Sequence, residues 1–452
     1  MEDKTKEFES KPIAALLWQY ALPAVITQII ASVYNICDRV FLGQCVGALA
    51  IAGLAVTMPI MNIVHAFGSL VGAGAGARLS IVLGKRDINW AENILGNTML
   101  LTFFFGALFL STWYGFSNQI LSMFGASADT IGYAKTYMDI VMPGMFLTTL
   151  SFNLTGLIRS SGYAKKSMWI TVIGALINIA LDALFIFALD WGIAGAAWAT
   201  TLSMAVSSVL SIAHFIDKKS FIRFKRHGWK PRFYIFRNIL AIGISPFSMN
   251  VAGSAVVALL NNQLLNYGGD NAVAANGIVN SFGPLVIMLV LGVCQGMQPI
   301  AGYNYGAGRN DRLRRVFLMA MKCNITIGIV GSLLVLFVPR YLAMAFTHED
   351  ELITMCVPAF RLVLGMSPLI AVTITNSQFF QSIDKPWVAI VTSLSRQVLI
   401  LTPLLYIIPP MAEQMGFSGL YGVFACCTTS DILGAALAMF LLKSQIHVLR
   451  GK

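Results

Sequence analysis

Long apolar runs bounded by short polar turns follow one another along the whole chain. A helix needs about 20 mostly apolar residues to cross a bilayer. Twelve runs meet this requirement, at residues 14–41, 48–76, 92–115, 131–158, 167–189, 193–215, 238–265, 274–301, 315–338, 354–380, 386–408 and 417–442. The pattern predicts an all-α polytopic membrane protein with twelve transmembrane helices.

Basic residues alternate between the two sets of connections that join these runs. One set holds most of the 31 Lys and Arg residues, whereas the other holds only Arg340. Cytoplasmic loops of membrane proteins collect Lys and Arg. The alternation therefore supports the division into twelve crossings and predicts that both termini face the cytoplasm.

Composition adds limits on function. The chain is 57% hydrophobic and 11% charged, so its net charge of +11 reflects membrane topology and predicts no nucleic-acid partner. Its seven cysteines form no CxxC pair, and its five histidines are scattered along the sequence. We therefore expect no disulfide framework, no metal cluster, no cofactor and no enzymatic activity.

The two halves of the chain repeat each other. The longest basic connection, 217–237, predicts a cytoplasmic linker between an N-lobe at 1–216 and a C-lobe at 238–452. Matching residues recur at an offset of 223–224, and Pro23 matches Pro246. Six crossings per half give both copies the same orientation, with a substrate site expected between them. The two prolines are candidate hinges, because a proline frees a main-chain carbonyl and lets a helix bend.

Carboxylates inside the first half are the main candidates for function. Asp38 lies near the end of the first run, and Asn178 and Asp182 are four residues apart on one helix face. An intramembrane acid is costly and usually faces a protein interior or a water-filled cavity. Two interpretations stay open: proton exchange by a carboxylate with a raised pKa, or a monovalent cation such as sodium held by oxygen ligands.

The second half carries other polar groups within its apolar runs. Arg396 and Asp431 are predicted either to pair with each other or to contact substrate. Uncharged amides accompany them and suggest a wet lumen, and the candidates for lining it are Asn276, Asn280, Gln295 and Asn376. Interhelical hydrogen bonding is the alternative role for each of these amides.

Several segments together resemble the multidrug and toxic compound extrusion (MATE) transporters, in particular their prokaryotic DinF- and MepA-like branch. They are "YNICDRVFLG", "IRSSG", "GALINIALDALFIF", "GIAGAAWAT", "QGMQPIAGYNYGA" and "LSRQVLILTPLL". The resemblance covers the whole chain. It implies two pseudo-symmetric six-helix lobes arranged in a V, and a monomer in the cytoplasmic (inner) membrane of a prokaryote.

The resemblance also implies a function. It predicts a secondary antiporter that exports amphipathic, often cationic, small molecules in exchange for H+ or Na+. It assigns cation or proton coupling to Asp38, Asn178 and Asp182, and adds Thr200.

For the substrate cavity the resemblance is less complete. Tyr34 stands in the matching first segment, but Thr155 replaces an Asn found in many relatives, and Asn153 lies two residues earlier. A lipid-linked glycan flippase of the same superfamily is the alternative function. It would be expected to line its cavity with several cationic side chains.

Overall fold

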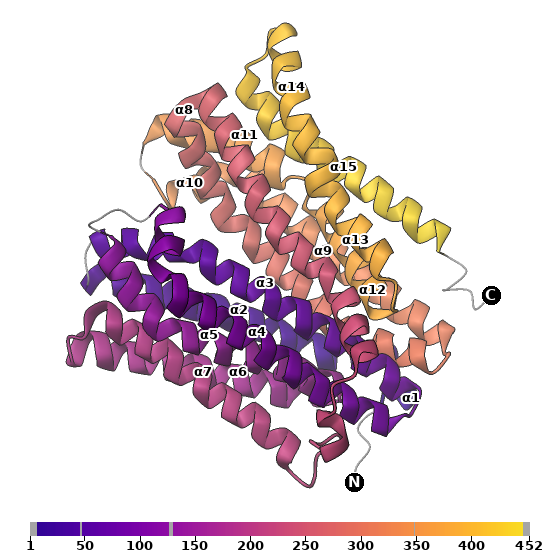
Figure 1. Ribbon diagram of the computed structural model, residues 1–452. Coiled ribbons are helices and arrows are strands. Elements are labelled where there is room, and N and C mark those ends of the chain that lie inside the picture. Colours follow the sequence, from indigo (N-terminus) through magenta and orange to yellow (C-terminus); the bar gives the residue numbers. More distant parts are fainter. Residues whose placement is uncertain (1–6, 46–47, 126–129, 348, 446–452) are drawn as a thin grey trace.

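The computed structural model describes residues 7–45, 48–125, 130–347 and 349–445, and these contain helices and no strands (Figure 1). The side chains of 35–40, 42–53 and 55 lie outside this description. The helices form two bundles, an arrangement that confirms the predicted fold class. Figure 1 shows the tip of α14 (Thr402–Gln414), in the second bundle, pointing away from the first bundle.

The first bundle contains six crossings. A short helix, α1 (Glu7–Ser10), precedes them. The crossings are α2 (Ile13–Cys45), α3 (Ala48–Gly84), α4 (Ile88–Met123), α5 (Ile131–Ser160), α6 (Ala164–Asp182) with its π-helical continuation η2 (Ala183–Ala188), and α7 (Gly192–Ile216). Helix α4 continues to Met123, beyond the predicted end at 115, since apolar residues persist there.

The second bundle follows a short 3-10 turn, η3 (Arg226–Trp229). Its elements are α8 (Phe233–Gly306), α9 (Asn310–Phe337), the short α10 (Pro339–Met344), α11 (Asp350–Leu364), α12 (Ser367–Ser382), α13 (Pro386–Leu394), the π-helical η4 (Ser395–Leu401), α14 and α15 (Gly419–Ser444). The predicted helix 354–380 is divided between α11 and α12, because Pro368 cannot donate a main-chain hydrogen bond.

Helix α8 accounts for two crossings. Its 74 residues would measure about 110 Å as one straight helix, far more than a bilayer's thickness. Gly269 interrupts it with φ 64° and ψ −164°, a conformation open to glycine. The described residues contain eleven helical stretches suited to crossing a membrane when α8 is counted once. Dividing α8 at Gly269 gives the twelve that the sequence predicts.

The linker is attached to the first bundle. The Asn97 Nδ2 donates to the carbonyl oxygens of Gly228 and Lys230 at 3.2 and 3.1 Å, and its Oδ1 accepts from the Arg232 N–H at 2.8 Å. Helix α8 then begins at Phe233, inside the predicted linker 217–237. The second bundle thus starts directly from a segment held by α4.

The bundles meet along α3 and α8 through glycines. A methyl group added at Gly74 or Gly84 would collide with the carbonyl oxygen of Ile239 or Tyr303. The converse holds for Gly243 and Gly306, which face the carbonyl oxygens of Leu70 and Ile81. We call these four glycines the glycine seam. Small residues let two helix backbones approach this closely.

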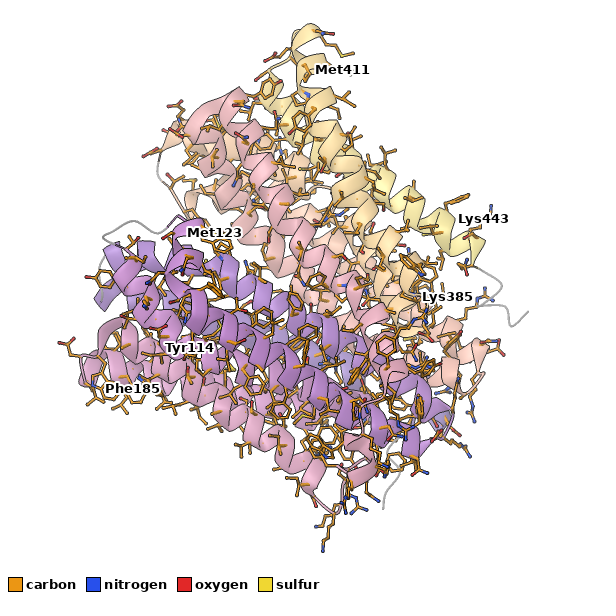
Figure 2. All side chains as sticks on the ribbon, viewed as in Figure 1. Tyr114, Met123, Phe185, Lys385, Met411 and Lys443 are labelled. Atoms are coloured by element: carbon orange, nitrogen blue, oxygen red, sulfur yellow. The ribbon has the colours of Figure 1, made fainter. Side chains whose placement is uncertain are left out.

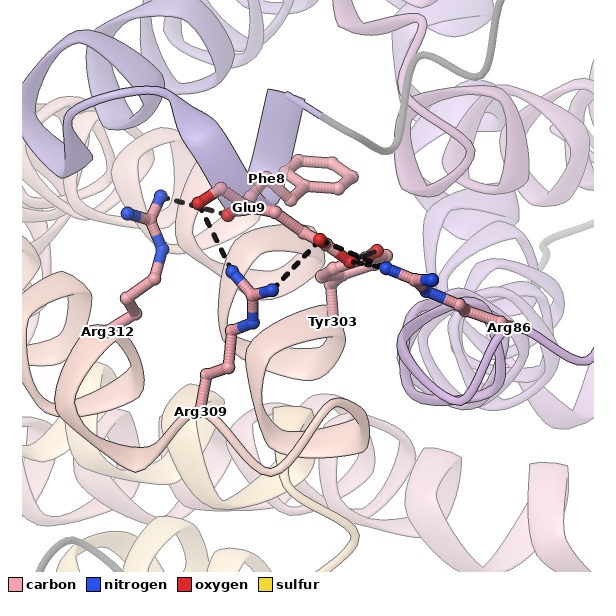
Figure 3. Close-up of polar contacts among 6 residues, drawn as sticks. All are labelled: Phe8, Glu9, Arg86, Tyr303, Arg309 and Arg312. Carbon is pink, nitrogen blue, oxygen red and sulfur yellow. Dashed lines mark hydrogen bonds and ion pairs between the residues drawn. The ribbon is translucent and has the colours of Figure 1, made fainter.

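One end of the molecule is tied together around α1, and we call it the α1 end. The Glu9 carboxylate accepts hydrogen bonds from the Tyr303 hydroxyl at 2.6 Å, the Arg309 Nη2 at 2.9 Å and the Arg86 Nη2 at 3.0 Å (Figure 3). Arg86 follows α3 in the first bundle, whereas Tyr303 and Arg309 belong to the second. Arg312 donates to the carbonyl oxygen of Phe8 (Figure 3). It also donates to the carbonyl oxygen of Lys11. This Glu9 cluster, comprising Phe8, Glu9, Arg86, Tyr303, Arg309 and Arg312, joins the bundles.

Lys and Arg residues gather at the α1 end, which is therefore the basic end, and some of them contact Glu9 or join the bundles. The hydrogen bonds from Tyr303 and Arg86, together with the charge of Arg309, hold the pKa of Glu9 below its ordinary value of 4.5. A second ion pair between the bundles joins Arg78 to Asp384 at 2.5 Å. Figure 2 shows Lys385 and Lys443 toward the side where α1 lies, with Met123, Phe185 and Met411 toward the other.

Candidate functional site

The first bundle encloses a polar cavity of about 200 Å³. Four of its lining residues follow one face of α5, namely Thr148, Ser151, Thr155 and Arg159. Phe152 of α5 also lines the cavity. The remaining lining residues come from α2, α3, α6, α7 and α8, and they are Thr27, Gln28, Ala31, Tyr34, His65, Ser167, Thr171, Ala175, Met204, Ser207 and Gln295. We call this space the first-bundle cavity.

Three of the predicted cavity residues line it, namely Tyr34, Thr155 and Gln295. Gln295 reaches it from α8, so the second bundle contributes to the wall. Asn153 is fully buried and donates to the Thr102 Oγ1 at 2.9 Å, on the side that faces α4. Residues two apart on a helix point in nearly opposite directions, so Asn153 and Thr155 cannot both face the cavity.

The predicted runs 131–158 and 167–189 leave Arg159 in a connection on the basic, predicted cytoplasmic side, but the structure places it in the wall of the first-bundle cavity. A signal for this was present in the sequence. Ser151, Thr155 and Arg159 are spaced by four, which puts them on one helix face if the helix continues to Ser160.

The predicted coupling residues lie farther along α6. Asn178 and Asp182 are both 0% exposed, on the helix face that carries Thr171 and Ala175 in the cavity wall. The Asn178 Nδ2 donates to the Thr200 Oγ1 at 3.4 Å, so the structure brings this pair together. The side chain of Asp38 lies outside the described residues.

The helix geometry changes directly after Asp182. Residues 183–188 form the π-helical η2. Short π-helical segments often accompany functional sites, because they turn side chains away from the regular helical register. Asp182 therefore occupies a polar interior at a point where α6 departs from regular geometry.

The predicted residues of the second bundle lie in separate contacts. The Arg396 Nη1 donates to the Asp431 Oδ1 at 2.7 Å, and Asp431 is only 1% exposed. Asn276 donates to the Asn261 Oδ1 at 3.2 Å, whereas Asn280 is exposed. Asn376 is fully buried, with its Nδ2 4.0 Å from the Met439 Sδ. None of these contacts belongs to the first-bundle cavity.

The two candidate hinges have matching surroundings. Pro23 lies inside α2 and Pro246 inside α8. The Thr27 Oγ1 donates to the Pro23 carbonyl oxygen at 2.9 Å, and the Asn250 Nδ2 donates to that of Pro246 at 2.9 Å. In each repeat, therefore, a polar side chain four residues on bonds the proline carbonyl.

No group of three or more His, Cys, Asp or Glu side chains arranged to hold a metal occurs among the residues that the structure describes. The cation candidates are therefore oxygens and amides of the first bundle. Carboxylate, amide and hydroxyl oxygens suit a hard monovalent cation, and a carboxylate alone suits a proton.

Comparisons with known proteins agree with this architecture. The MatE family model matches the chain twice, at residues 23–184 and 246–407, an offset of 223. The multidrug export protein MepA of Staphylococcus aureus (strain MSSA476) is 23% identical over 441 residues, covering 98% of this chain and 96% of its own. MepA of Staphylococcus saprophyticus has the same identity and coverage.

Solved structures share the fold. An outward-facing multidrug resistance MATE family transporter of the MOP superfamily superposes with a TM-score of 0.91 at 21% identity, covering 99% of both chains. A MOP superfamily transporter from Pyrococcus furiosus, described as having a binding pocket of reverse polarity, gives a TM-score of 0.90 at 21% identity, covering 100% of this chain and 99% of its own. Because the MatE family model matches both halves of the chain, the chain belongs to the MatE family of membrane transporters.

Proposed function

We propose that this protein is a secondary active antiporter that exports amphipathic, often cationic, small molecules in exchange for H+ or Na+. The observation that carries the proposal is the placement of Asn178 and Asp182 on the same face of α6 as the wall of the first-bundle cavity. Ion binding and substrate binding would thus act on one helix. The name of the MepA relatives supports export of several drugs.

The contacts between the bundles indicate which side of the membrane this conformation closes. Positive-inside topology assigns the basic α1 end to the cytoplasm. The Glu9 cluster, the Arg78–Asp384 pair and the glycine seam join the bundles toward this end. This conformation would therefore be closed to the cytoplasm, in agreement with the similarity to an outward-facing structure.

Exchange requires that the ion and the substrate weaken each other's binding. If binding of one changes the affinity for the other, the reverse must hold by the same factor. Asp182 and Asp38 are the proposed ion-binding acids, with Asn178 and Thr200 as supporting oxygen or amide groups. The proposed location is the cytoplasmic membrane of a prokaryote, with both termini inside and a single chain as the working unit.

Ethidium efflux from cells tests this proposal. We expect Asp182→Asn and Asp38→Asn to reduce energised efflux to the level of cells that lack the protein. Asp190→Asn is the matched control, because Asp190 is an exposed acid with φ 53°, a conformation that asparagine tolerates. Wild-type efflux in both acid variants would remove the coupling role.

Proteoliposomes distinguish the coupling ion. Efflux is measured with a pH gradient alone and with a sodium gradient alone, at equal protein density. Stimulation by either gradient in the wild-type protein, and its loss in Asp182→Asn, is the expected result. Equal transport with and without both gradients would rule out ion exchange.

A further inference from the structure

Arg159 places a positive charge at one end of the first-bundle cavity. None of the described residues that line the cavity is acidic. Its Nε is enclosed and has no hydrogen-bond partner. Within the described part of the chain, no carboxylate forms an ion pair with its guanidinium. A guanidinium offers five N–H donors, so binding capacity is left unused here.

Helix capping does not account for this side chain. Arg159 lies in the last turn of α5, where a cation is favoured by the helix dipole. The terminal carbonyls nevertheless have main-chain donors already. The N–H groups of Ser161, Gly162 and Tyr163 bond the carbonyl oxygens of Leu157, Arg159 and Ile158 at 2.9, 3.2 and 3.1 Å. The guanidinium is therefore available to something in the cavity.

Several hydroxyl groups of the cavity wall have the opposite hydrogen-bonding character. The hydroxyl groups of Thr155, Ser167, Thr171 and Ser207 donate to main-chain oxygens at 2.8, 2.9, 3.3 and 3.1 Å. Each hydroxyl has one hydrogen, so what remains for a ligand is oxygen lone pairs. Such a wall suits a cationic or hydrogen-donating group.

Thr148, whose hydroxyl donates to the Gly144 carbonyl oxygen at 2.9 Å, lies at the other end of the α5 lining from Arg159. On α5, the lining residues run from Arg159 to Thr148, a helical rise of about 16 Å. Arg159 is at the α1 end, since the Tyr20 hydroxyl, packed on Phe8 of α1, donates to the Gly162 carbonyl oxygen at 3.1 Å. A ligand with separated charges would thus be oriented by the cavity.

We propose that Arg159 binds a carboxylate on the transported molecule, so that the first-bundle cavity selects amphipathic zwitterions and holds them with the anionic group toward the α1 end. This inference rests on the proposed export function and names a substrate class for it. Guanidinium and carboxylate match in geometry and can form two parallel hydrogen bonds. The cavity volume of about 200 Å³ accommodates the polar part of such a molecule.

Binding of a matched dye pair tests the assignment. Rhodamine B carries a free carboxylate, and its ethyl ester has the same ring system without that charge. Dissociation constants are measured by fluorescence anisotropy on the full-length protein in nanodiscs of neutral lipid. We expect the wild-type protein to bind the acid about tenfold more tightly than the ester.

Variants then test whether Arg159 causes the preference for the acid dye. Arg159→Met should remove the preference, so that acid and ester bind with similar dissociation constants. Arg159→Lys should retain part of the preference, because lysine keeps the charge but not the paired donors. Lys165→Met is the matched control, since it removes an exposed cation near the same end. Equal binding of acid and ester by the wild type, or equal loss of both in Arg159→Met, would overturn the proposal.

Two further measurements separate the alternatives. If adding an anionic lipid to the nanodiscs competes with the acid dye, the site belongs to a lipid headgroup and the substrate assignment is wrong. Ethidium efflux from cells that carry the wild-type protein tests the export function separately from the role of Arg159. Absence of ethidium efflux in the wild type would reject the export function, while the dye-binding comparison would still decide the role of Arg159.

Discussion

Glu9 ties both bundles to α1, so its replacement by glutamine is expected to weaken closure of the α1 end. Glutamine keeps the shape of the side chain and can still accept a hydrogen bond from Tyr303, but it loses the negative charge. Glu9 is 18% exposed, whereas Arg86 and Arg309 are 74% and 40% exposed. Solvent therefore screens the two arginine contacts more than the tyrosine contact.

The magnitude follows from these contacts. Converting the Tyr303 hydrogen bond from a charged to a neutral acceptor costs about 1 kcal/mol. The partly exposed Arg309 pair adds about 0.5 kcal/mol. The contact with Arg86, which is 74% exposed, contributes little because solvent screens it. The closed conformation should lose about 1.5 kcal/mol, which corresponds to a tenfold shift toward opening.

Cysteine accessibility measures this shift. Ser80 is 1% exposed and lies in α3 beside Gly302 of α8, so Ser80→Cys would react only when the bundles part. In a background that lacks the seven native cysteines, its labelling rate by a permeant maleimide reports the open population. We expect Glu9→Gln to raise this rate about tenfold.

Glu7→Gln is the matched control for this experiment. Glu7 also lies on α1, but the Lys11 Nζ and Gln19 Nε2 that donate to it, at 2.8 and 2.9 Å, belong to the same N-terminal segment. Labelling should therefore stay near the wild-type rate in this variant. An unchanged rate in Glu9→Gln would refute the view that Glu9 contributes to closure.

Three further predictions concern pH and the two interfaces. The pKa of Glu9 is lowered, so its stabilising contacts are complete at pH values above 4.5 and are lost only as pH falls through the depressed pKa. The ratio of the Glu9→Gln labelling rate to the wild-type labelling rate should therefore stay constant from about pH 8 to about pH 6. Asp431→Asn leaves Arg396 without its partner and should cost about 3–5 kcal/mol of stability, measured by thermal unfolding, with most of it recovered in Arg396→Met/Asp431→Leu. Gly243→Ala should prevent close contact with the Leu70 carbonyl and raise Ser80→Cys labelling, whereas Gly277→Ala, which meets open space, should not.

The architecture could be predicted from the sequence because it depends on the lengths of apolar runs. Twelve crossings and their duplication can be predicted from composition and spacing, and Gly269 is the point at which the structure divides α8 into two of these crossings. Short-range geometry was also accessible. The four-residue spacing of Asn178 and Asp182 predicted a shared face, and the structure buries both.

Side-chain direction at helix ends could not be predicted in the same way. Arg159 was interpreted as a loop cation because its placement depends on α5 continuing to Ser160. Whether Asn153 or Thr155 faces the cavity depends on which helix packs against each side of α5. Asn153 bonds a residue of α4 and so points away from the cavity. The Glu9 cluster depends on residues about 300 positions away, and no local pattern in the sequence records such a contact.

The glycine seam has a consequence for the speed of the transport cycle. Its contacts are between main chains whose peptide groups are already hydrogen-bonded within their own helices, so separating these glycines from the facing carbonyls strands no polar group. Elsewhere α3 and α8 are joined by side-chain hydrogen bonds, from the Gln298 Nε2 to the Ala73 carbonyl oxygen at 3.2 Å and from the Asn250 Nδ2 to the Ser69 Oγ at 3.3 Å. The activation barrier is therefore expected to reside in the polar contacts that join the bundles, including the ionic contacts at the α1 end, so substitutions there should change turnover without altering the residues of the first-bundle cavity.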